Sequence, residues 1–295
     1  EEPPVTYEER LVTLAMVGIF LSGFTSMVYE LVWFRIFAVV LESSTYSFSL
    51  MLAAFITGIT VGSLVAGQLM TRTRRLLFWF ALCEFGIAAT IILAVPLYER
   101  LPYYFWTIRY LLRPIEDTYL YYNLMKFGLC FVIMLAPTLF FGMTLPLVSN
   151  IAGTSMGQMA RKIGNVYAAN TVGTLLGALA TGLLFIPSLG LAHSLEIAFL
   201  LNLLIAVVVL LKSTDLPSLL WRKAVPGASV VLVLAYIVLV PDWDNKSFAL
   251  GVFRLRGAPP ATYVDFRSMP VHDYTLRYYK DGLSSNVAVL EHKLN

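Results

Sequence analysis

The sequence predicts an all-α polytopic membrane bundle followed by a short polar tail. Hydrophobic residues make up 58% of the 295-residue chain and charged residues only 13%, and the mean hydropathy is +0.75. Soluble domains carry about a quarter charged residues. The apolar stretches end near residue 241, and charges of alternating sign follow. The net charge of +3 is too small to indicate nucleic-acid binding.

Seven stretches are long enough to cross a bilayer as helices. A hydrocarbon core about 30 Å thick requires roughly 20 apolar residues per helix. The predicted spans are residues 11–40, 45–70, 76–97, 123–150, 164–186, 192–211 and 224–240. Residues 1–241 are therefore the predicted transmembrane domain, and residues 242–295 are the predicted soluble tail.

Basic residues gather in alternate loops, which sets the predicted orientation. Loops 71–75, 151–163 and 212–223 each carry two or three Lys or Arg residues. Of the loops between them, 41–44 and 187–191 carry no basic residue, and the charges of 98–122 sum to zero. Because cytoplasmic loops are enriched in Lys and Arg, this side and the N-terminus are predicted to be cytoplasmic. Seven spans then place the tail on the outer side of the membrane.

Residues 98–122 connect the third and fourth spans and are rich in aromatic and basic residues. Aromatic rings favour the depth of the lipid headgroups. The segment predicts a short amphipathic helix that lies at the membrane interface. A lid over a binding site is the alternative.

An internal repeat is the next prediction. Residues 53–67 align with residues 168–182, and the small residues Gly58 and Gly62 match Gly173 and Gly177. Such glycines let membrane helices approach closely. Spans three and six also align, and three helices per copy give the inverted 3+3 repeat of many transporters. The alternative is that any two tightly packed helices acquire glycines.

Glu84 lies near the middle of the third span, where an unpaired charge costs several kcal/mol. Asn170 and Asn202 fall at compatible depths, and Asn202 aligns with Glu84 in the repeat. These three residues are the candidate intramembrane polar site, which in a transporter would bind a proton or a cation. The alternative is a neutral glutamic acid that holds helices together.

Four residues near the outer end of the first span are secondary candidates. Glu30 and Arg35 are five residues apart, so they share a helix face poorly and are expected to act between helices or at the interface. Tyr29 and Trp33 surround them.

Lys126, His193 and Glu196 lie near span ends, and we expect their side chains to reach solvent. Pro137 and Pro146 predict a bent or broken fourth span, which is where a transporter would place its substrate.

Cys83 and Cys130 both lie in apolar spans, so neither a disulfide framework nor a metal site is predicted.

The tail contains a predicted β-hairpin. Residues 274–280 and 286–291 have the composition of strands, and Asp281-Gly282 between them is a typical hairpin turn. A two-stranded hairpin alone is only marginally stable in water. It therefore requires more chain or a surface to pack against.

Several motifs of this chain resemble one family. They are Ser22-Gly23, Tyr29-Glu30-Leu31-Val32-Trp33-Phe34-Arg35, Gly142-Met143-Thr144-Leu145-Pro146, Gly164-Asn165-Val166-Tyr167-Ala168-Ala169-Asn170, Pro187-Ser188-Leu189-Gly190 and Tyr278-Tyr279-Lys280-Asp281-Gly282. They resemble the membrane-embedded spermidine-synthase-like proteins, also called fused transporter/spermidine synthases. The resemblance implies the inner membrane of a prokaryote, and a tail that begins a truncated aminopropyltransferase-like β domain.

The family's enzymes transfer an aminopropyl group from decarboxylated S-adenosylmethionine to putrescine. None of their catalytic elements occurs in residues 1–295. We therefore expect no cofactor in this chain, and decarboxylated S-adenosylmethionine only if a complete synthase domain follows.

Three hypotheses for the function remain open: a membrane module that anchors or serves such a domain, a transporter of polyamines or small organic cations, and a structural subunit of a larger membrane complex. The expected partners are the lipid bilayer, a polyamine ligand and a second copy or a larger complex, without nucleic acid.

Overall fold

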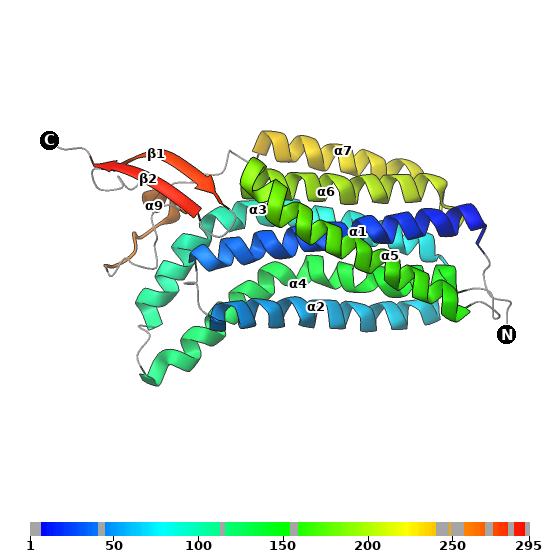
Figure 1. Cartoon of the computed structure of the whole chain (residues 1–295), viewed down its shortest axis with the longest axis horizontal. Helices are drawn as coiled ribbons and strands as arrows, with labels where there is room; N and C mark the ends of the chain where they lie inside the picture. Colours follow the sequence, from blue (N-terminus) through cyan, green and yellow to red (C-terminus); the bar gives the residue numbers. More distant parts are fainter. Residues whose placement is uncertain are drawn as a thin grey trace.

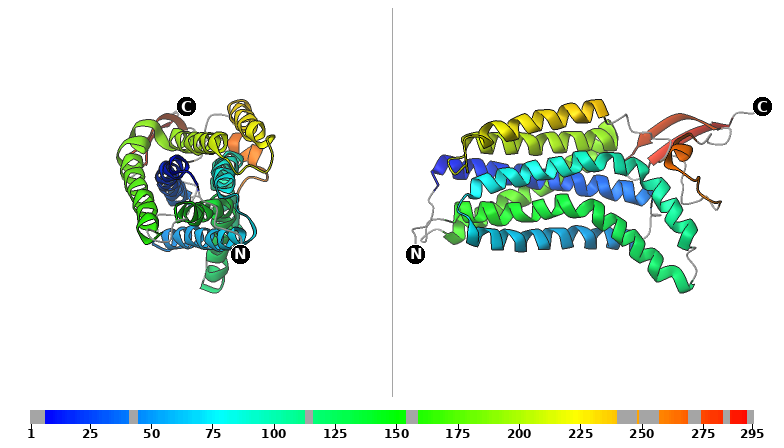
Figure 2. Two further views of the ribbon diagram at one scale, coloured as in Figure 1. Left: turned by 90° about the vertical axis from the view of Figure 1, so that its right-hand side faces the viewer. Right: turned by 180° about the vertical axis from the view of Figure 1, so that it is seen from behind.

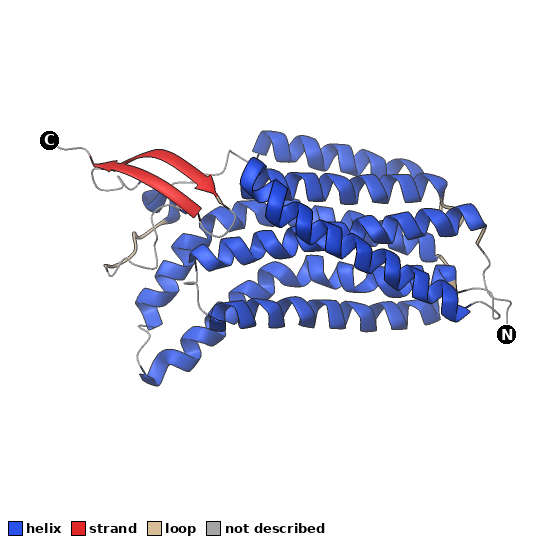
Figure 3. Ribbon diagram, in the orientation of Figure 1, coloured by secondary structure: helices blue, strands red, loops and turns tan. Residues whose placement is uncertain are grey.

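A computed structural model describes residues 7–40, 45–112, 116–153, 159–239, 248, 257–268, 274–282 and 286–292. Six helical segments in these ranges are long and apolar enough to cross a membrane. The first four are α1 (Glu9–Val40), α2 (Thr45–Arg72), α3 (Leu76–Leu112) and α4 (Tyr119–Ala152), and they lie side by side in one bundle (Figures 1 and 3). The polytopic helical bundle predicted from composition is confirmed.

The fifth segment, Met159–Lys212, folds back on itself at Gly190. It comprises α5 (Met159–Ala180), a π-helical turn η3 (Thr181–Phe185) and α6 (Ile186–Lys212). Gly190 has a φ of 80°, which glycine adopts readily because it lacks a Cβ. After this residue the chain runs back along the bundle, so that α5 and α6 correspond to the two predicted spans (Figure 1).

The sixth segment lies in α7 (Trp221–Leu239), which contacts α6 and, to a lesser extent, α3. Seen end-on, α7 lies at the periphery, whereas α1 lies inside the bundle (Figure 2). The start of α1 and the hairpin are at opposite ends of the bundle (Figure 1). This arrangement agrees with the predicted odd number of passes. The predicted domain boundary at residue 241 lies outside the described residues.

Two predictions about the region around residues 98–122 are wrong. The third span does not end at residue 97, because α3 continues as one helix of 37 residues to Leu112. A separate interfacial helix is therefore absent from the described part of 98–122, where only a short 3-10 turn (η1, Glu116–Thr118) precedes α4. α4 stays one helix from Tyr119 to Ala152 through Pro137 and Pro146, so the span is not broken there, and a bend at these prolines stays a prediction.

The glycines singled out by the repeat lie where helices cross most closely. α2 packs chiefly on α4, and α5 packs chiefly on α1. A Cβ at Gly62 would collide with the Leu139 carbonyl of α4, and a Cβ at Gly177 would collide with the Phe24 carbonyl of α1. Gly58 and Gly173 make the same kind of approach, to Thr138 and to the Phe20 carbonyl. These four glycines therefore lie at close contacts between helices, the place at which they were predicted to serve packing.

The end of the bundle near the N-terminus is held by Asp215, in the segment between α6 and α7. Its carboxylate accepts hydrogen bonds from the backbone N–H groups of Leu77 (3.0 Å) and Phe78 (3.1 Å) in the first turn of α3. The Tyr7 hydroxyl also donates to Asp215, at 2.7 Å. A carboxylate satisfies the free N–H groups and the positive end of a helix. The N-terminus, α3 and the α6–α7 segment thus meet at one side chain.

The tail contains a short helix, α9 (Tyr263–Ser268), and the strands β1 (Tyr274–Asp281) and β2 (Asn286–His292). The strands pair antiparallel, with Asp281 opposite Asn286 and an irregularity between Leu276 and Tyr278. The predicted hairpin is confirmed. It packs against the bundle, since β1 contacts α6 and Tyr279 lies against the helical core.

Candidate functional site

A buried polar network joins α1, α3 and α6, and Asn202 is its centre. Asn202 Nδ2 donates hydrogen bonds to Glu84 Oε2 (2.6 Å) and to Thr25 Oγ1 (3.1 Å). The Tyr29 hydroxyl donates to Asn202 Oδ1 at 3.0 Å. All four side chains are fully buried. The structure thus places Glu84 and Asn202 in contact, together with Thr25 and Tyr29 of α1.

One oxygen of the Glu84 carboxyl remains available. The Ser22 hydroxyl lies beside this carboxyl, on the α1 side. Yet among the described residues neither Glu84 Oε1 nor Ser22 Oγ completes a hydrogen bond of good geometry. Both atoms are buried, and most buried polar atoms in proteins have a partner. The pair is therefore a place where a proton or a small polar ligand would find two oxygen atoms.

The helical spacing of α1 brings its polar residues to this place. Ser22, Thr25 and Tyr29 are separated by three and four residues, so they lie on one face of the helix. Trp33 follows four residues later, stacks on Tyr29 with ring centres 5.9 Å apart, and donates from Nε1 to the Tyr98 hydroxyl at 2.8 Å. A line of polar side chains thus leads from Glu84 toward the end of α1 that faces the hairpin.

Asn170 does not join this network in the described structure. It lies on α5 against Gly23 of α1, where its backbone carbonyl and side-chain oxygen face the missing Cβ. Of the secondary candidates, Tyr29 and Trp33 belong to the polar line. Glu30 is half-buried on α1, and the charge of Arg35 acts on Asp281 of the hairpin.

The sequence analysis assigned no site role to Ser22, Thr25 or Tyr98, because it singled out mainly ionisable and amide side chains. Hydroxyl groups are common in membrane helices and do not stand out by composition. The three-and-four spacing from Ser22 to Trp33 was the pattern that could have revealed the α1 residues.

Lys126 corrects another expectation. Its side chain does not reach solvent but is buried, at 5% exposure, with Nζ 4.3 Å from the centre of the Tyr122 ring. An ammonium over an aromatic face is attracted by the ring. A lysine four residues inside the predicted span can therefore stay within the protein.

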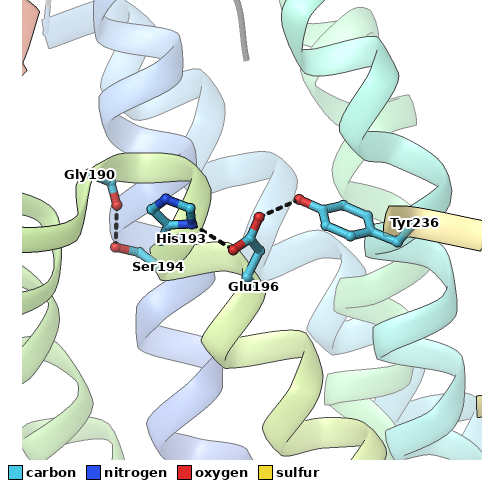
Figure 4. Close-up of polar contacts among 5 residues, drawn as sticks. All are labelled: Gly190, His193, Ser194, Glu196 and Tyr236. Atoms are coloured by element: carbon cyan, nitrogen blue, oxygen red, sulfur yellow. Dashed lines mark hydrogen bonds and ion pairs between the residues drawn. The ribbon is translucent and has the colours of Figure 1, made fainter. Parts of the chain in front are cut away.

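His193 and Glu196 lie on the first turns of α6 after Gly190 (Figure 4). His193 is exposed, as predicted, and its Nδ1 is 2.6 Å from Glu196 Oε2. The other carboxylate oxygen accepts a hydrogen bond from Tyr236 of α7 at 2.9 Å. Glu196 is therefore a bridge between α6 and α7 rather than a solvated side chain.

Asp281 of β1 seats the hairpin on the bundle. Its Oδ2 accepts a hydrogen bond of 3.2 Å from the backbone N–H of Leu191, directly after Gly190. The carboxyl is buried, and its Oδ1 completes no hydrogen bond of good geometry among the described residues. Burial raises the pKa of Asp281, while hydrogen bonds from Tyr279 and Leu191 and the charge of Arg35 act in the opposite direction.

A second contact holds the tail to the outer half of α3. The Tyr103 hydroxyl is 3.2 Å from the carbonyl of Pro260, and Trp106 Nε1 donates to the Gly257 carbonyl at 3.0 Å. Both rings pack against Phe266 of α9. We call this contact, formed by Tyr103, Trp106, Tyr263 and Phe266, the aromatic clamp. The aromatic residues of the 98–122 segment thus bind the tail.

Metal chemistry finds no support at these places. No group of three or more His, Cys, Asp or Glu side chains is close enough to hold a metal ion within the described ranges. Cys83 and Cys130 are both free and buried.

Comparison with protein-family models, curated proteins and solved structures gives no match. The resemblance to the spermidine-synthase-like family therefore stays a prediction.

Proposed function

We propose that the bundle is a proton-linked carrier of small organic cations, with Glu84 as the proton-binding group. The observation that carries the proposal is the fully buried Glu84 carboxyl, which has one oxygen bonded to Asn202 and the other without a partner. A carboxyl group at this depth is costly in its charged form unless a cation lies beside it. Proton and cation can therefore occupy it in turn.

The neighbours of Glu84 favour exchange over a fixed ion pair. Ser22 and Asn202 are the polar side chains next to it, and both are neutral. The resting bundle therefore favours the protonated acid, because a carboxylate without a countercharge is poorly solvated there. A cationic substrate or water that reaches the site would replace the proton.

The helix contacts support an inverted repeat. If α1–α3 and α4–α6 are two copies, the contact of α2 with α4 is equivalent to the contact of α5 with α1, and these are the two closest crossings. Glu84 and Asn202 occupy equivalent positions and bond to each other, as expected for residues near a two-fold axis. Transporters with such repeats bind substrates at the repeat interface near the middle of the membrane.

Uptake by proteoliposomes tests this function. Purified protein should accumulate labelled putrescine or spermidine when a pH gradient is imposed, and Glu84→Gln should reduce uptake at least tenfold. The matched control is Glu196→Gln, which makes the same change on α6 outside the network and should retain uptake. Equal uptake by wild type and Glu84→Gln would exclude Glu84 as the coupling group.

The docked tail favours a second function, which is to anchor or serve an aminopropyltransferase-like domain. Asp281 and the aromatic clamp hold the tail at two separate places, on α6 and on α3. Such a seat would present a following domain at the mouth of the bundle. Pull-down of aminopropyltransferase activity with this membrane module would support that function, and a stable, inactive protein without a bound domain would contradict it.

A further inference from the structure

We propose that the hairpin is a pH-sensitive latch that closes one end of the bundle by seating Asp281 on the helix that follows Gly190. In the closed state, β1 lies on α6 and Tyr279 covers the core. In the open state, the hairpin leaves this seat while the aromatic clamp keeps the tail attached. The movement of the hairpin is independent of the proposed carrier function. Only the idea that this movement lets protons or cations reach Glu84 rests on that function.

The seat is built from a glycine and a helix end. Gly190 has a positive φ, and a Cβ added to it would lie 3.4 Å from Asp281 Oδ2. The following N–H, of Leu191, points at the same oxygen. Helix N-termini attract negative charge through their free N–H groups. The position therefore accepts a carboxylate, and the sequence supplies one from a distant segment.

The seat satisfies the carboxyl group incompletely. Asp281 is 8% exposed, and one of its two oxygens has no partner in the described structure. The charged and titratable groups that act on it are Arg35 of α1 and Tyr279 of β1. The removal of the Asp281 carboxyl from water raises its pKa by more than these groups lower it. The closed state therefore holds a proton on Asp281 more readily than the open state, in which the carboxyl is hydrated.

The direction of the pH effect follows from this difference. The pKa of Asp281 is higher when the latch is closed than in water, so acid favours the closed state. As pH rises from the usual range of an aspartate through the raised pKa, closure weakens. Each unit of difference between the two pKa values changes the closing equilibrium about tenfold.

The latch lies at the end of the polar line of α1. Arg35 acts on Asp281, and Trp33 and Tyr29 on the same helix lead inward to Asn202 and Glu84. Movement of the hairpin would therefore uncover the end of the bundle to which that line leads. The clamp is mainly apolar, so it remains closed over the same pH range.

Spin-label distances in the full chain test the latch. Labels at Val289→Cys on β2 and Val230→Cys on α7 use exposed positions, and Cys83 and Cys130 are buried. In lipid nanodiscs we expect one short distance at about pH 4.5 and a second, longer population at about pH 8, a range that spans a raised aspartate pKa. A distance distribution that is the same at both pH values would overturn the proposal.

Two variants assign the effect to Asp281. Asp281→Asn keeps an oxygen for Leu191 without a charge, so its hairpin should stay closed at both pH values. Glu291→Gln makes the same change at an exposed carboxyl of β2 and should behave like wild type. Persistence of the pH effect in Asp281→Asn would exclude the latch. If the distances follow the proposal but proteoliposomes show no uptake, the latch stands and the carrier function fails.

Discussion

Asn202 of α6 and Glu84 of α3 are joined by a hydrogen bond of 2.6 Å. The amide also binds Tyr29 and Thr25, so one side chain ties three helices together. A single asparagine therefore serves both the stability of the bundle and the orientation of its buried carboxyl. The two roles can be separated by experiment.

Asn202→Ala should lower the stability of the bundle by about 1–3 kcal/mol, because it leaves buried polar groups without partners. Thermal unfolding in detergent measures the change. Asn123→Ala, at a half-buried asparagine whose amide bonds only to the Tyr119 carbonyl of its own helix, is the control and should change the melting temperature far less. An unchanged melting temperature for Asn202→Ala would mean that the network contributes nothing to folding.

The link between Tyr29 and Asn202 should appear as a coupling energy. In a double-mutant cycle, Tyr29→Phe and Asn202→Ala should be non-additive by about 0.5–2 kcal/mol. Tyr167→Phe, at an exposed tyrosine of α5, should add independently to Asn202→Ala. Additive behaviour of Tyr29→Phe would show that its hydroxyl does not bind Asn202.

The glycine crossings predict a sharp difference between neighbouring positions. Gly62→Ala and Gly177→Ala should each destabilise the protein by about 1–3 kcal/mol, since a Cβ there meets the backbone of the facing helix. Gly67→Ala and Gly182→Ala should be neutral or stabilising, because nothing lies within 4 Å of the added carbon. Similar melting temperatures for all four variants would disprove the close approach.

Asp215→Ala should loosen the end of the bundle near the N-terminus. Loss of the carboxylate leaves the N–H groups of Leu77 and Phe78 without an acceptor, and loss of a helix cap costs about 0.5–2 kcal/mol. Hydrogen exchange should rise in the first turn of α3 and not at its far end. Asp215→Asn should retain part of the protection, whereas uniform exchange along α3 would argue against a local cap.

Labelling from outside the cell tests the predicted orientation. Ser268→Cys in α9 is exposed and should react with a membrane-impermeant maleimide in intact cells. Arg161→Cys, at the opposite end of the bundle, should react only after the membrane is permeabilised. The reverse pattern would invert the orientation that the basic loops predict.

Local patterns in the sequence predicted much of this fold. Hydropathy located the passes, strand composition located the hairpin, and the similar depths of Glu84 and Asn202 in their spans suggested that the two could meet. The predictions that the structure corrects concerned features that depend on contacts between segments distant in sequence. The C-terminal part of α3 contacts the tail through Tyr103 and Trp106, and the buried Lys126 lies over the Tyr122 ring. Asp215 caps a helix more than a hundred residues away in sequence, which no local pattern reveals.

The reversal of the chain between the fifth and sixth predicted spans falls at Gly190, within the predicted loop 187–191. Two prolines in α4 suggested a break there, yet that helix is continuous. The break falls at Gly190, where the backbone conformation and the carboxylate of Asp281 act together. A glycine between two apolar stretches indicates a turn, but only the folded structure shows what lies against it.

The peripheral position of α7 has a consequence for how such a protein could change during evolution. The contacts that define the network and the two glycine crossings lie within α1–α6, and α7 rests on their outside. Gain or loss of this one helix would leave those contacts in place. It would, however, transfer every residue after it to the other compartment. A single peripheral helix thus determines which aqueous phase the hairpin, and anything attached to it, encounters.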